Sequence, residues 1–367
     1  MSPVRITTVA APRSRFISSE LAKGLFGTVP NTIVTLVIAG LLITILPKIV
    51  RWAFLDSVWL PADYQTCLQG EGACWAFIQS KFRLILFGRY PMEEQWRPIL
   101  AMVLFIGALG ITADWRQWGK RNWSRVVLLL WLATLTTCSI LMTGGLFGLP
   151  LVRLEMWSGL PLTIMLASIG IFLAFWLSIF LALGRCSRLP IIRWVSIAYI
   201  ELIRGVPLIS ILFMAAVVLP IILPEGVGVD KLLRAQLAFF LFFAAYMAEA
   251  LRGGLQAIPK GQYEAADALG LTYWQSMRRI IVPQALRVTI PSMVNIFIAA
   301  FKDTSLVVII SMHDLLGTTN ASINDPAWLG IYLEAYIFTA LIYLGFCFLI
   351  SSYSQRLEVY LNAGTKK

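Results

Sequence analysis

The sequence is poor in charged residues and in the side chains that build catalytic centres. Only 13% of its 367 residues are charged and 59% are hydrophobic, a balance that excludes a soluble globular protein. His313 is the only histidine, and no paired-carboxylate, nucleophile–base or metal-ligand pattern is present, which argues against a membrane-embedded enzyme. The phosphate-binding pattern GxxxxGK[ST] is also missing, so the chain has no such loop with which to hold ATP.

The five cysteines show no metal-site spacing. Cys67 and Cys74 share a predicted outer loop, where an oxidising periplasm permits either a short disulfide or two free thiols. No cleavable signal peptide is evident, because the first long apolar run begins after residue 23 and is too long for one. We expect that run to act as its own insertion signal.

Long apolar segments are what the chain has in abundance. Two of them contain ionisable residues, which at membrane depth usually face a bundle interior or a wet cavity: 235–251 with Glu249, and 288–310 with Lys302 and Asp303. The other six are free of charge and lie near the roughly 20 residues that a helix needs to cross a bilayer; they are 24–47, 98–113, 126–152, 156–184, 206–224 and 335–355. The pattern predicts an all-α membrane protein with about eight transmembrane helices.

Lysine and arginine are distributed unevenly between the expected loops. With eight spans and both termini in the cytoplasm, twenty of the thirty basic residues lie on the cytoplasmic side, nine lie outside and Lys302 lies within the membrane. This excess satisfies the positive-inside rule and explains the net charge of +11. Because the charges form no basic groove lined by aromatic residues, we expect membrane lipid around the chain and no nucleic-acid partner.

The first part of the chain, 1–155, holds three spans and a long outer loop at 48–97. That loop is too long and too aromatic for a plain turn, so we expect it to lie on the membrane surface or to meet a partner outside the cell; its tryptophans are Trp59, Trp75 and Trp96.

From residue 156 the loops become shorter. The second part is 156–358, and 359–367 is a cytoplasmic tail. Small residues recur every four positions in the span at 156–184, a stripe that favours close packing against another helix; they are Gly170, Ala174, Ser178 and Ala182.

An ExxRG motif occurs twice, at 201–205 and at 249–253. A glutamate and an arginine three residues apart face each other on one helical turn, so Glu201 is expected to pair with Arg204, and Glu249 with Arg252. Two interpretations are open. The pairs either neutralise charge at the inner ends of helices, or they also stiffen or gate the cytoplasmic mouth of a pathway.

Residues 258–283 read as a protruding helix–turn–helix on the cytoplasmic side. Gly270 fits the end of a short alanine-rich helix. Thr272 and Gln275 have the spacing of a capping box that begins a second helix, and Pro283 is expected to end that helix.

The first helix of this segment has the composition of a contact surface for a soluble protein. Its alanines, Ala265 and Ala266 among them, are small enough to let the backbone enter a groove, while Glu264 and Asp267 offer carboxylates to basic or amide groups of a partner. A helix lying on the membrane would instead carry large apolar residues on one face and lysine or arginine on the other.

This segment resembles the cytoplasmic EAA loop of the permease subunits of ATP-binding-cassette (ABC) importers. The residues at the family's spacing are Glu264, Ala265, Ala266, Gly270, Ile280 and Pro283, with Val282 in place of a leucine. Other segments are similar to the polar amino acid group of these importers, namely Tyr199-Ile200-Glu201, Arg204-Gly205-Val206-Pro207-Leu208, Ile258-Pro259-Lys260-Gly261-Gln262 and Lys302-Asp303-Thr304-Ser305-Leu306. The resemblance covers about 160–358, and the extension before it is similar to the larger permease subunits of general L-amino acid importers.

The resemblance implies a type I permease core of five helices, preceded by a three-helix extension, in the bacterial inner membrane. It implies a second permease subunit, two cytoplasmic ATPases that bind ATP and magnesium, and a solute-binding protein in the periplasm. The chain itself would hold no cofactor and would not be an enzyme. Its coupling residues would be Glu264, Ala265, Ala266, Asp267, Gly270, Ile280 and Pro283, seated on the ATPase.

A polar L-amino acid crossing the bilayer needs partners for its ammonium and carboxylate groups. Glu249 is a candidate for the ammonium, and the candidates for the carboxylate are Asn295, Lys302, Thr304 and Ser305, with Asp303 paired to Lys302. Alternatively, Lys302 and Asp303 neutralise each other and mark a break in the helix. An ion-gradient-driven amino acid transporter or a channel is the competing function, but neither needs an alanine-rich cytoplasmic loop.

Overall fold

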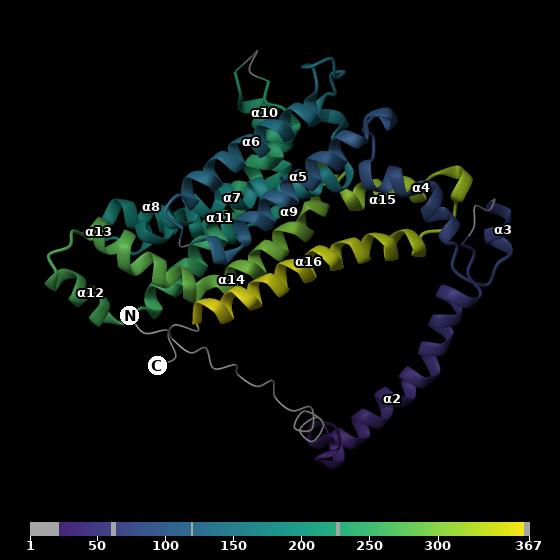
Figure 1. Cartoon of the computed structure of the whole chain (residues 1–367), viewed down its shortest axis with the longest axis horizontal. Coiled ribbons are helices and arrows are strands. Elements are labelled where there is room, and N and C mark those ends of the chain that lie inside the picture. Colours follow the sequence, from purple (N-terminus) through teal and green to yellow (C-terminus); the bar gives the residue numbers. More distant parts are fainter. Residues whose placement is uncertain (1–21, 60–63, 119, 225–227, 363–367) are drawn as a thin grey trace. The chain divides into compact units, whose positions relative to one another are not determined.

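The computed structural model describes residues 22–59, 64–118, 120–224 and 228–362. Its regular elements in these ranges are helices, as the all-α prediction required, and the only strand-like features there are two isolated backbone bridges (Figure 1). The chain packs as two compact units, Met1–Ala76 and Phe77–Lys367. The unit boundary therefore falls inside the long outer loop.

The first unit contains one long, strongly apolar helix. Helix α2 (Val29–Val50) is capped by the Thr28 hydroxyl and continues as a π-helical turn, η1 (Arg51–Leu55). No residue of α2 is buried, so its side chains are free to face lipid. Its mean hydropathy reaches 2.5 over the best 18-residue window.

After α2 the first unit is held by a disulfide and by aromatic contacts. A short helix, α3 (Tyr64–Gln69), carries Cys67, which is bonded to Cys74 with the two Cα atoms 5.5 Å apart. The bonded state is thus the one present, of the two that the sequence left open. The indole of Trp75 donates to the carbonyl of Ala53 at 2.7 Å, and its ring lies 5.8 Å from that of Trp59.

Seven helical segments of the described chain are long and apolar enough to cross a membrane. Each contains or overlaps one of the eight predicted spans; they are Val29–Leu55, Met92–Ala113, Trp123–Thr143, Gly159–Arg185, Lys231–Ala257, Tyr273–Ile310 and Leu333–Leu361.

The remaining predicted span, at 206–224, differs from the expectation. The inner loop expected before it is a helix, α8 (Pro190–Arg204), and the span itself consists of α9 (Leu208–Phe213), a π-turn η5 (Met214–Val218) and α10 (Leu219–Ile222). The two stretches meet at an angle of 100°. Pro207 explains the bend, since it lacks an N–H group and disfavours helical geometry at the residue before it.

The second unit is built around two long helices, α7 (Gly159–Arg185) and α11 (Lys231–Ala257), which pack against each other. All four residues of the predicted small-residue stripe on α7 are buried, which confirms that they lie at a close helix contact. At Gly170 an added Cβ would lie 3.1 Å from the side chains of Gln236 and Phe239 on α11. The absence of a side chain at Gly170 is therefore what lets α11 approach α7 at this point.

Two further helices complete this core. Helix α14 (Val282–Asp303) packs on α11, and α16 (Leu333–Asn362) packs on α14. Lys302 and Asp303 lie where α14 ends and a 3-10 helix, η7 (Thr304–Ile310), begins, so the helix changes type at this point and continues without a break.

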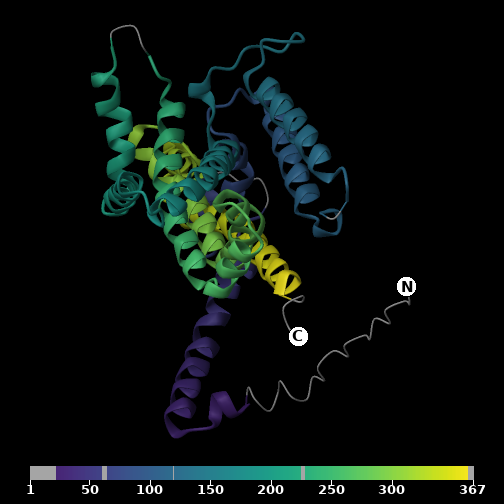
Figure 2. The same cartoon turned by 90° about the vertical axis from the view of Figure 1, so that its left-hand side faces the viewer.

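Helices α5 (Trp96–Ala113) and α6 (Trp123–Thr143) form an antiparallel hairpin beside the core (Figure 2). The 3-10 turn η3 (Trp115–Gln117) follows α5. Its Trp115 stacks on Tyr360 at 5.6 Å, and the Tyr353 hydroxyl donates to Ala113 O at 2.9 Å, so α16 contacts this end of the hairpin.

The outer-loop residues from Phe77 onward are packed rather than free. They comprise most of α4 (Trp75–Phe87) and the turn η2 (Met92–Glu94), and they contact α15 (Leu315–Ile323) and the turn η8 (Pro326–Trp328). Lys81 forms an ion pair with Asp325, and the Thr318 hydroxyl donates to Ile85 O at 2.5 Å. These contacts make this part of the loop a second layer over α15.

A pair of adjacent glycines on α11 tests how tightly α11 and α14 approach. An added Cβ at Gly254 would lie 2.7 Å from the Ala285 carbonyl oxygen, whereas at Gly253 nothing lies within 4 Å. We expect Gly254→Ala to reduce the free energy of unfolding by about 1–3 kcal/mol through overpacking, and to lower the thermal unfolding midpoint of the purified protein in detergent.

Gly253→Ala is the matched control, because alanine is the better helix former and meets no neighbour. Its unfolding midpoint should stay the same or rise. Equal midpoints for the two variants would contradict a close α11–α14 contact.

Candidate functional site

The helix–turn–helix predicted at 258–283, which we call the knob, is present. Its first helix is α12 (Lys260–Ala268), which follows Pro259. The end of α12 is a complete Schellman motif: Gly270 N–H donates to Asp267 O at 2.9 Å, and Leu271 N–H donates to Ala266 O at 3.2 Å. Gly270 has φ +69°, a left-handed conformation that glycine adopts without strain. The position of Gly270 therefore has a purely conformational reason.

The second helix of the knob begins with the predicted capping box. Gln275 N–H donates to the Thr272 hydroxyl at 3.4 Å, and Thr272 N–H donates to the Gln275 side chain at 3.0 Å. This helix, α13 (Tyr273–Ser276), has its first turn fixed by these two bonds.

The prediction that Pro283 ends this helix was wrong. The chain continues from α13 through a π-helical turn, η6 (Met277–Ile281), directly into α14, where Pro283 sits in the first turn. Val282 N–H donates to Met277 O, five residues back. This wider register lets the helix pass a residue that has no N–H to donate.

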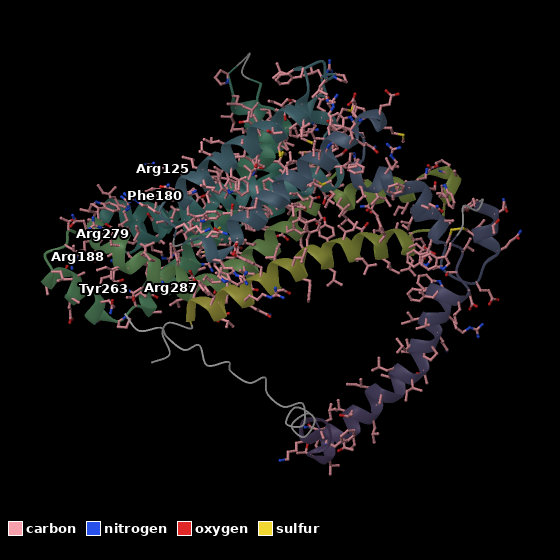
Figure 3. The ribbon with its side chains drawn as sticks, viewed as in Figure 1. Arg125, Phe180, Arg188, Tyr263, Arg279 and Arg287 are labelled. Carbon is pink, nitrogen blue, oxygen red and sulfur yellow. A yellow bond between two sulfur atoms is a disulfide. The ribbon has the colours of Figure 1, made fainter. Side chains whose placement is uncertain are left out.

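The exposed face of α12 defines what we call the coupling surface: Glu264, Ala265, Asp267, Ala268 and the adjoining Leu269 and Trp274, all of them exposed. Leu269 and Trp274 are 74% and 64% exposed, whereas Ala266 is completely buried. Ala266 therefore packs against the protein, while its neighbours in the motif face outward. Figure 3 places Tyr263, Arg279 and Arg287 at this end of the protein.

The remaining predicted coupling residues serve the fold. Ile280 is half-buried against the core, and Pro283 is exposed on α14. The knob is fastened to its neighbours by two side-chain bonds, from the Tyr263 hydroxyl to Leu255 O at 3.3 Å and from the Gln284 amide to the Gln262 amide oxygen at 3.1 Å. Helix α12 is therefore bonded to both α11 and α14.

A cluster of five charged side chains joins α7, α8 and α11. Its residues on α11 lie two to three helical turns before α12. Its centre is the Glu249 carboxylate on α11, whose side chain is 20% exposed. Glu249 lies 2.6 Å from an Arg252 nitrogen, 3.3 Å from an Arg185 nitrogen at the end of α7, and 4.0 Å from an Arg204 nitrogen at the end of α8. Three arginines thus share one carboxylate.

The fifth member, Glu201 on α8, pairs with Arg185 at 2.8 Å. The expected pairing of Glu201 with Arg204 is therefore wrong, although Glu249 does pair with Arg252 as its spacing predicted. Arg204 instead points across to Glu249 and lies over the Tyr246 ring at 5.6 Å. Ion pairs between helices replace the expected pair within α8, because Arg185 of α7 lies close to Glu201 and Glu249 of α11 lies close to Arg204.

This arrangement argues against Glu249 as the partner of a substrate ammonium group. Its carboxylate is already surrounded by three guanidinium groups, and with Glu201 the cluster holds three positive and two negative charges. The ammonium group of a substrate would therefore meet net positive charge at this cluster.

The other predicted path residues come from α14 and η7. Asn295 and Lys302 are exposed and lie seven residues apart, on one face of α14. Asp303 and Ser305 are half-buried, and Thr304 is fully buried with its hydroxyl bonded to Phe301 O at 2.9 Å. Lys302 and Asp303 do not form an ion pair, since the Lys302 ammonium nitrogen is not within 4.0 Å of an Asp303 carboxylate oxygen.

Sequence reasoning missed a buried polar centre at Asp314. Its carboxylate is fully buried, caps α15 through Gly317 N–H at 2.9 Å, and accepts the Tyr343 hydroxyl of α16 at 2.9 Å. Leu315 N–H donates to the Thr163 hydroxyl of α7 at 3.0 Å. Burial raises the pKa of Asp314 above its ordinary value. The signal available was an aspartate just before an apolar run, which is a helix cap.

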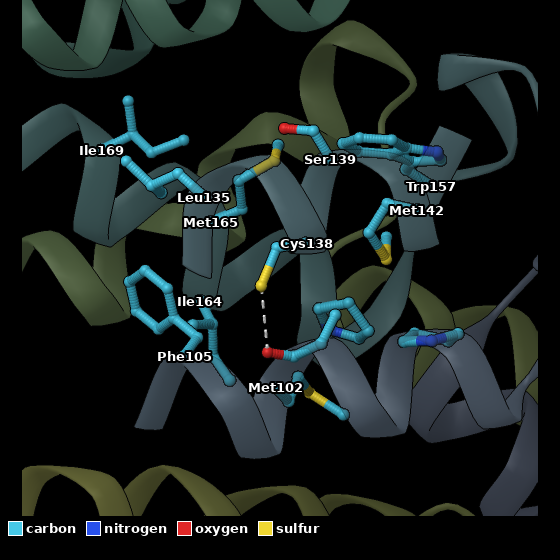
Figure 4. A pocket seen from close by; sticks show the side chains of 13 residues that line it. Met102, Phe105, Leu135, Cys138, Ser139, Met142, Trp157, Ile164, Met165 and Ile169 are labelled. Atoms are coloured by element: carbon cyan, nitrogen blue, oxygen red, sulfur yellow. Dashed lines mark hydrogen bonds between the residues drawn. The ribbon is translucent and has the colours of Figure 1, made fainter. Parts of the chain in front are cut away.

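A separate cavity of about 110 Å³ lies between α5, α6 and α7 (Figure 4). Its lining is apolar apart from Ser139 and Cys138, and the Cys138 thiol donates to Ala101 O at 3.4 Å. It offers no charged group to a zwitterion. Within the described residues, no cluster of histidine, cysteine, aspartate and glutamate could hold a metal ion.

Comparison with known proteins places the chain in a family. A model of the "binding-protein-dependent transport system inner membrane component" family matches residues 174–359. The chain belongs to this family. It is a multi-pass membrane protein with the helical architecture of an ABC-importer permease. Membership of this family does not favour the alternative function, an ion-gradient-driven transporter or a channel.

Two relatives match over nearly the whole chain, including the N-terminal extension. The inner membrane amino-acid ABC transporter permease protein YhdY of Escherichia coli (strain K12) is 44% identical over 93% of this chain and 92% of its own length. The glutamate/glutamine/aspartate/asparagine transport system permease protein BztC of Rhodobacter capsulatus is 37% identical over 96% of each chain. A crystal structure of an amino acid ABC transporter with histidines is 32% identical, with a TM-score of 0.49 over 55% of this chain and 91% of that one.

The two glutamates of the cluster should differ in their contribution to stability. Glu249→Gln leaves three arginines close together without their shared counter-charge, so we expect a loss of about 1–3 kcal/mol and a lower thermal unfolding midpoint. Glu201→Gln is the matched control, since this side chain is 56% exposed and has one partner; its loss should be at most about 1 kcal/mol. A larger effect of Glu201→Gln would show that Glu249 is not the centre.

Proposed function

We propose that this chain is the membrane-spanning subunit of an importer that moves polar L-amino acids into the cytoplasm, driven by ATP hydrolysis on a separate ATPase subunit. The exposed face of α12 carries this proposal, because it is a polar, alanine-rich surface on a protein that otherwise belongs in lipid. Membership of the binding-protein-dependent transport family supports it. Relatives named for amino acid transport support the substrate class.

The proposed mechanism is mechanical. A groove on the ATPase would receive α12, with its alanines allowing close approach and with Glu264 and Asp267 accepting hydrogen bonds or ion pairs. Leu269 and Trp274 would supply the apolar anchors that protein interfaces use. ATP and magnesium would be bound by the ATPase, since this sequence lacks a phosphate-binding loop of the GxxxxGK[ST] kind.

Force applied to α12 would reach the spans by short covalent and packed routes. On one side α12 is separated from α11 by only Ile258 and Pro259. On the other side it contacts α13 and η6, which are continuous with α14. Because α11 is the centre of the core, a displacement of α12 would shift α7 and α8 as well, through the Glu249 cluster.

The excess of basic residues in alternate loops supports an orientation with both termini and α12 in the cytoplasm. On that orientation, α4 and α15 face the periplasm, where a solute-binding protein would deliver the amino acid. A second permease subunit would complete the pathway. We assign the substrate-facing role to exposed or half-buried polar groups of α14 and η7, namely Asn295, Lys302, Asp303 and Ser305.

A charge reversal on α12 tests the coupling surface. We expect Glu264→Lys to insert normally in the membrane but to weaken binding of the ATPase subunit at least tenfold, the size expected for a residue at the centre of an interface. The measurement is copurification and titration of the ATPase on the permease in nanodiscs, followed by substrate-stimulated ATP hydrolysis.

Glu93→Lys is the matched control, because Glu93 is an exposed carboxylate in η2, on the side proposed to face the periplasm. This variant should bind the ATPase like the unmodified chain. If Glu264→Lys retained full binding and stimulated hydrolysis, α12 would lose its assignment as the coupling helix.

The energy source is tested with the full importer in proteoliposomes. We expect uptake of radiolabelled glutamate, glutamine, aspartate, asparagine, histidine or arginine to require ATP and the solute-binding protein, and to be unaffected when ion gradients are collapsed. Uptake driven by an ion gradient without ATP would overturn the proposal. ATP-dependent uptake of a different solute would overturn only the substrate class.

A further inference from the structure

Helix α8 presents three distinct faces. One face is attached to the core: Ser196 and Ile200 are buried, and the Tyr199 hydroxyl donates to Leu241 O of α11 at 2.7 Å. Ser196 lies against Gly184 of α7, where an added Cβ would come within 2.3 Å of the serine oxygen. This face explains how α8 is held but not what its other faces contact.

The second face is an exposed apolar stripe. Its residues follow the spacing i, i+3, i+4, i+7 and i+11, which places them on one side of a helix. We call them the α8 stripe: Ile191, Trp194, Val195, Ala198 and Leu202. Ile191, Trp194, Val195 and Leu202 are 79%, 69%, 64% and 68% exposed. Large side chains this exposed in a continuous row mark a contact with lipid or with another protein.

The third face is basic. Arg193 is exposed on α8, and Arg188 is exposed in the turn just before it. Neither forms an ion pair with a carboxylate among the described residues, in contrast to Arg185 and Arg204. Figure 3 shows Arg188 at the same end of the protein as Tyr263 of the knob. Two guanidinium groups are thus available for an external anion.

The direction of α8 is set by the bend at Pro207. The helix makes an angle of 100° with α9–η5–α10, which covers most of the span predicted at 206–224; the two stretches reach the length and composition of a span only together. With that stretch crossing the bilayer, α8 runs nearly parallel to the membrane surface. Its 15 residues extend roughly 22 Å, less than the hydrocarbon core, but α9–η5–α10 has the same length, so the orientation of α8 rests on the bend between the two stretches.

We propose that α8 is an interfacial helix that binds anionic phospholipid in the leaflet on the side of α12. The α8 stripe rests on the acyl chains, Trp194 sits at the level of the headgroups, and Arg188 and Arg193 bind lipid phosphates. A basic amphipathic helix with a tryptophan on its apolar face has the composition of this class of membrane contact.

Charge complementarity favours lipid over a second permease as the occupant. The cores of protein interfaces are depleted of charged residues, whereas the α8 stripe is one row wide and belongs to a helix that carries Arg193 on another face, with Arg188 in the turn before it. The same helix also carries Glu201 and Arg204, which join it to the Glu249 cluster. Bound lipid would therefore fix the position of one of the three helices that meet at that cluster.

The depth of α8 in the membrane tests the first half of this proposal. Nitroxide labels would be placed singly at Ile191→Cys, Val195→Cys, Ala198→Cys and Leu202→Cys in the full importer, with Cys138, Cys186 and Cys347 replaced by serine. Collision with oxygen and with a nickel chelate then reports depth. We expect all four labels to be accessible to oxygen at one depth, near the headgroup boundary.

Two results would overturn it. A helix that crosses the bilayer would spread the four depths over roughly 16 Å, from eleven residues at 1.5 Å each. Labels shielded from both oxygen and nickel would show that a protein subunit covers the stripe.

The lipid preference tests the second half. Spin-labelled phosphatidylglycerol and phosphatidylcholine would be compared in the same reconstituted importer. We expect Arg188→Gln with Arg193→Gln to reduce the selectivity for phosphatidylglycerol at least fivefold, since each cation near an anionic surface changes binding by about that factor. The matched pair Arg188→Lys with Arg193→Lys should retain it. Unchanged selectivity in the glutamine variant, or equal loss in the lysine variant, would refute binding by these charges.

Discussion

The ion-pair cluster around Glu249 is the contact on which the end of the protein next to α12 depends. It is the place where α7, α8 and α11 are joined by charge, and one carboxylate serves three arginines. Such a cluster is stable only as a whole, because removal of the shared carboxylate leaves like charges close together. The cluster therefore links three helices to one another next to α12.

In the proposed mechanism, this connection would let a short helix act on a large bundle. α12 has nine residues, and it touches the spans chiefly through α11 on one side and through η6 on the other. Without the cluster, a push on α11 would be taken up by sliding between α11 and its neighbours. With it, α8 and the end of α7 follow α11. The opposite end of α7 is fixed in a different way, by the hydrogen bond that Leu315 N–H of α15 donates to the Thr163 hydroxyl.

Local rules predicted the elements well, and contacts between distant segments were what they missed. Gly270 and the capping box at Thr272 and Gln275 depend on a few neighbouring residues, so the sequence was sufficient. The small-residue stripe of α7 was readable because its period is that of a helix. Pro283 was misjudged because the π-turn before it adapts the helix to the proline. The Glu201–Arg204 pair was misjudged because Arg185, sixteen residues before Glu201, competes for it.

The site residues divide along the same line. The outward position of Glu264 and Asp267 follows from helical periodicity, but the engagement of Glu249 depends on α7 and α8, which no spacing within α11 reveals. A charged residue inside a predicted span was interpreted as facing substrate, whereas here its charge is neutralised by arginines from neighbouring helices. Charge within a span indicates a polar environment; only the packing of other helices decides whether that environment is a pathway or a joint. On this chain the joint lies on α11, and the polar groups that the proposed function assigns to a pathway lie on α14 and η7, where the helix changes from α to 3-10 geometry.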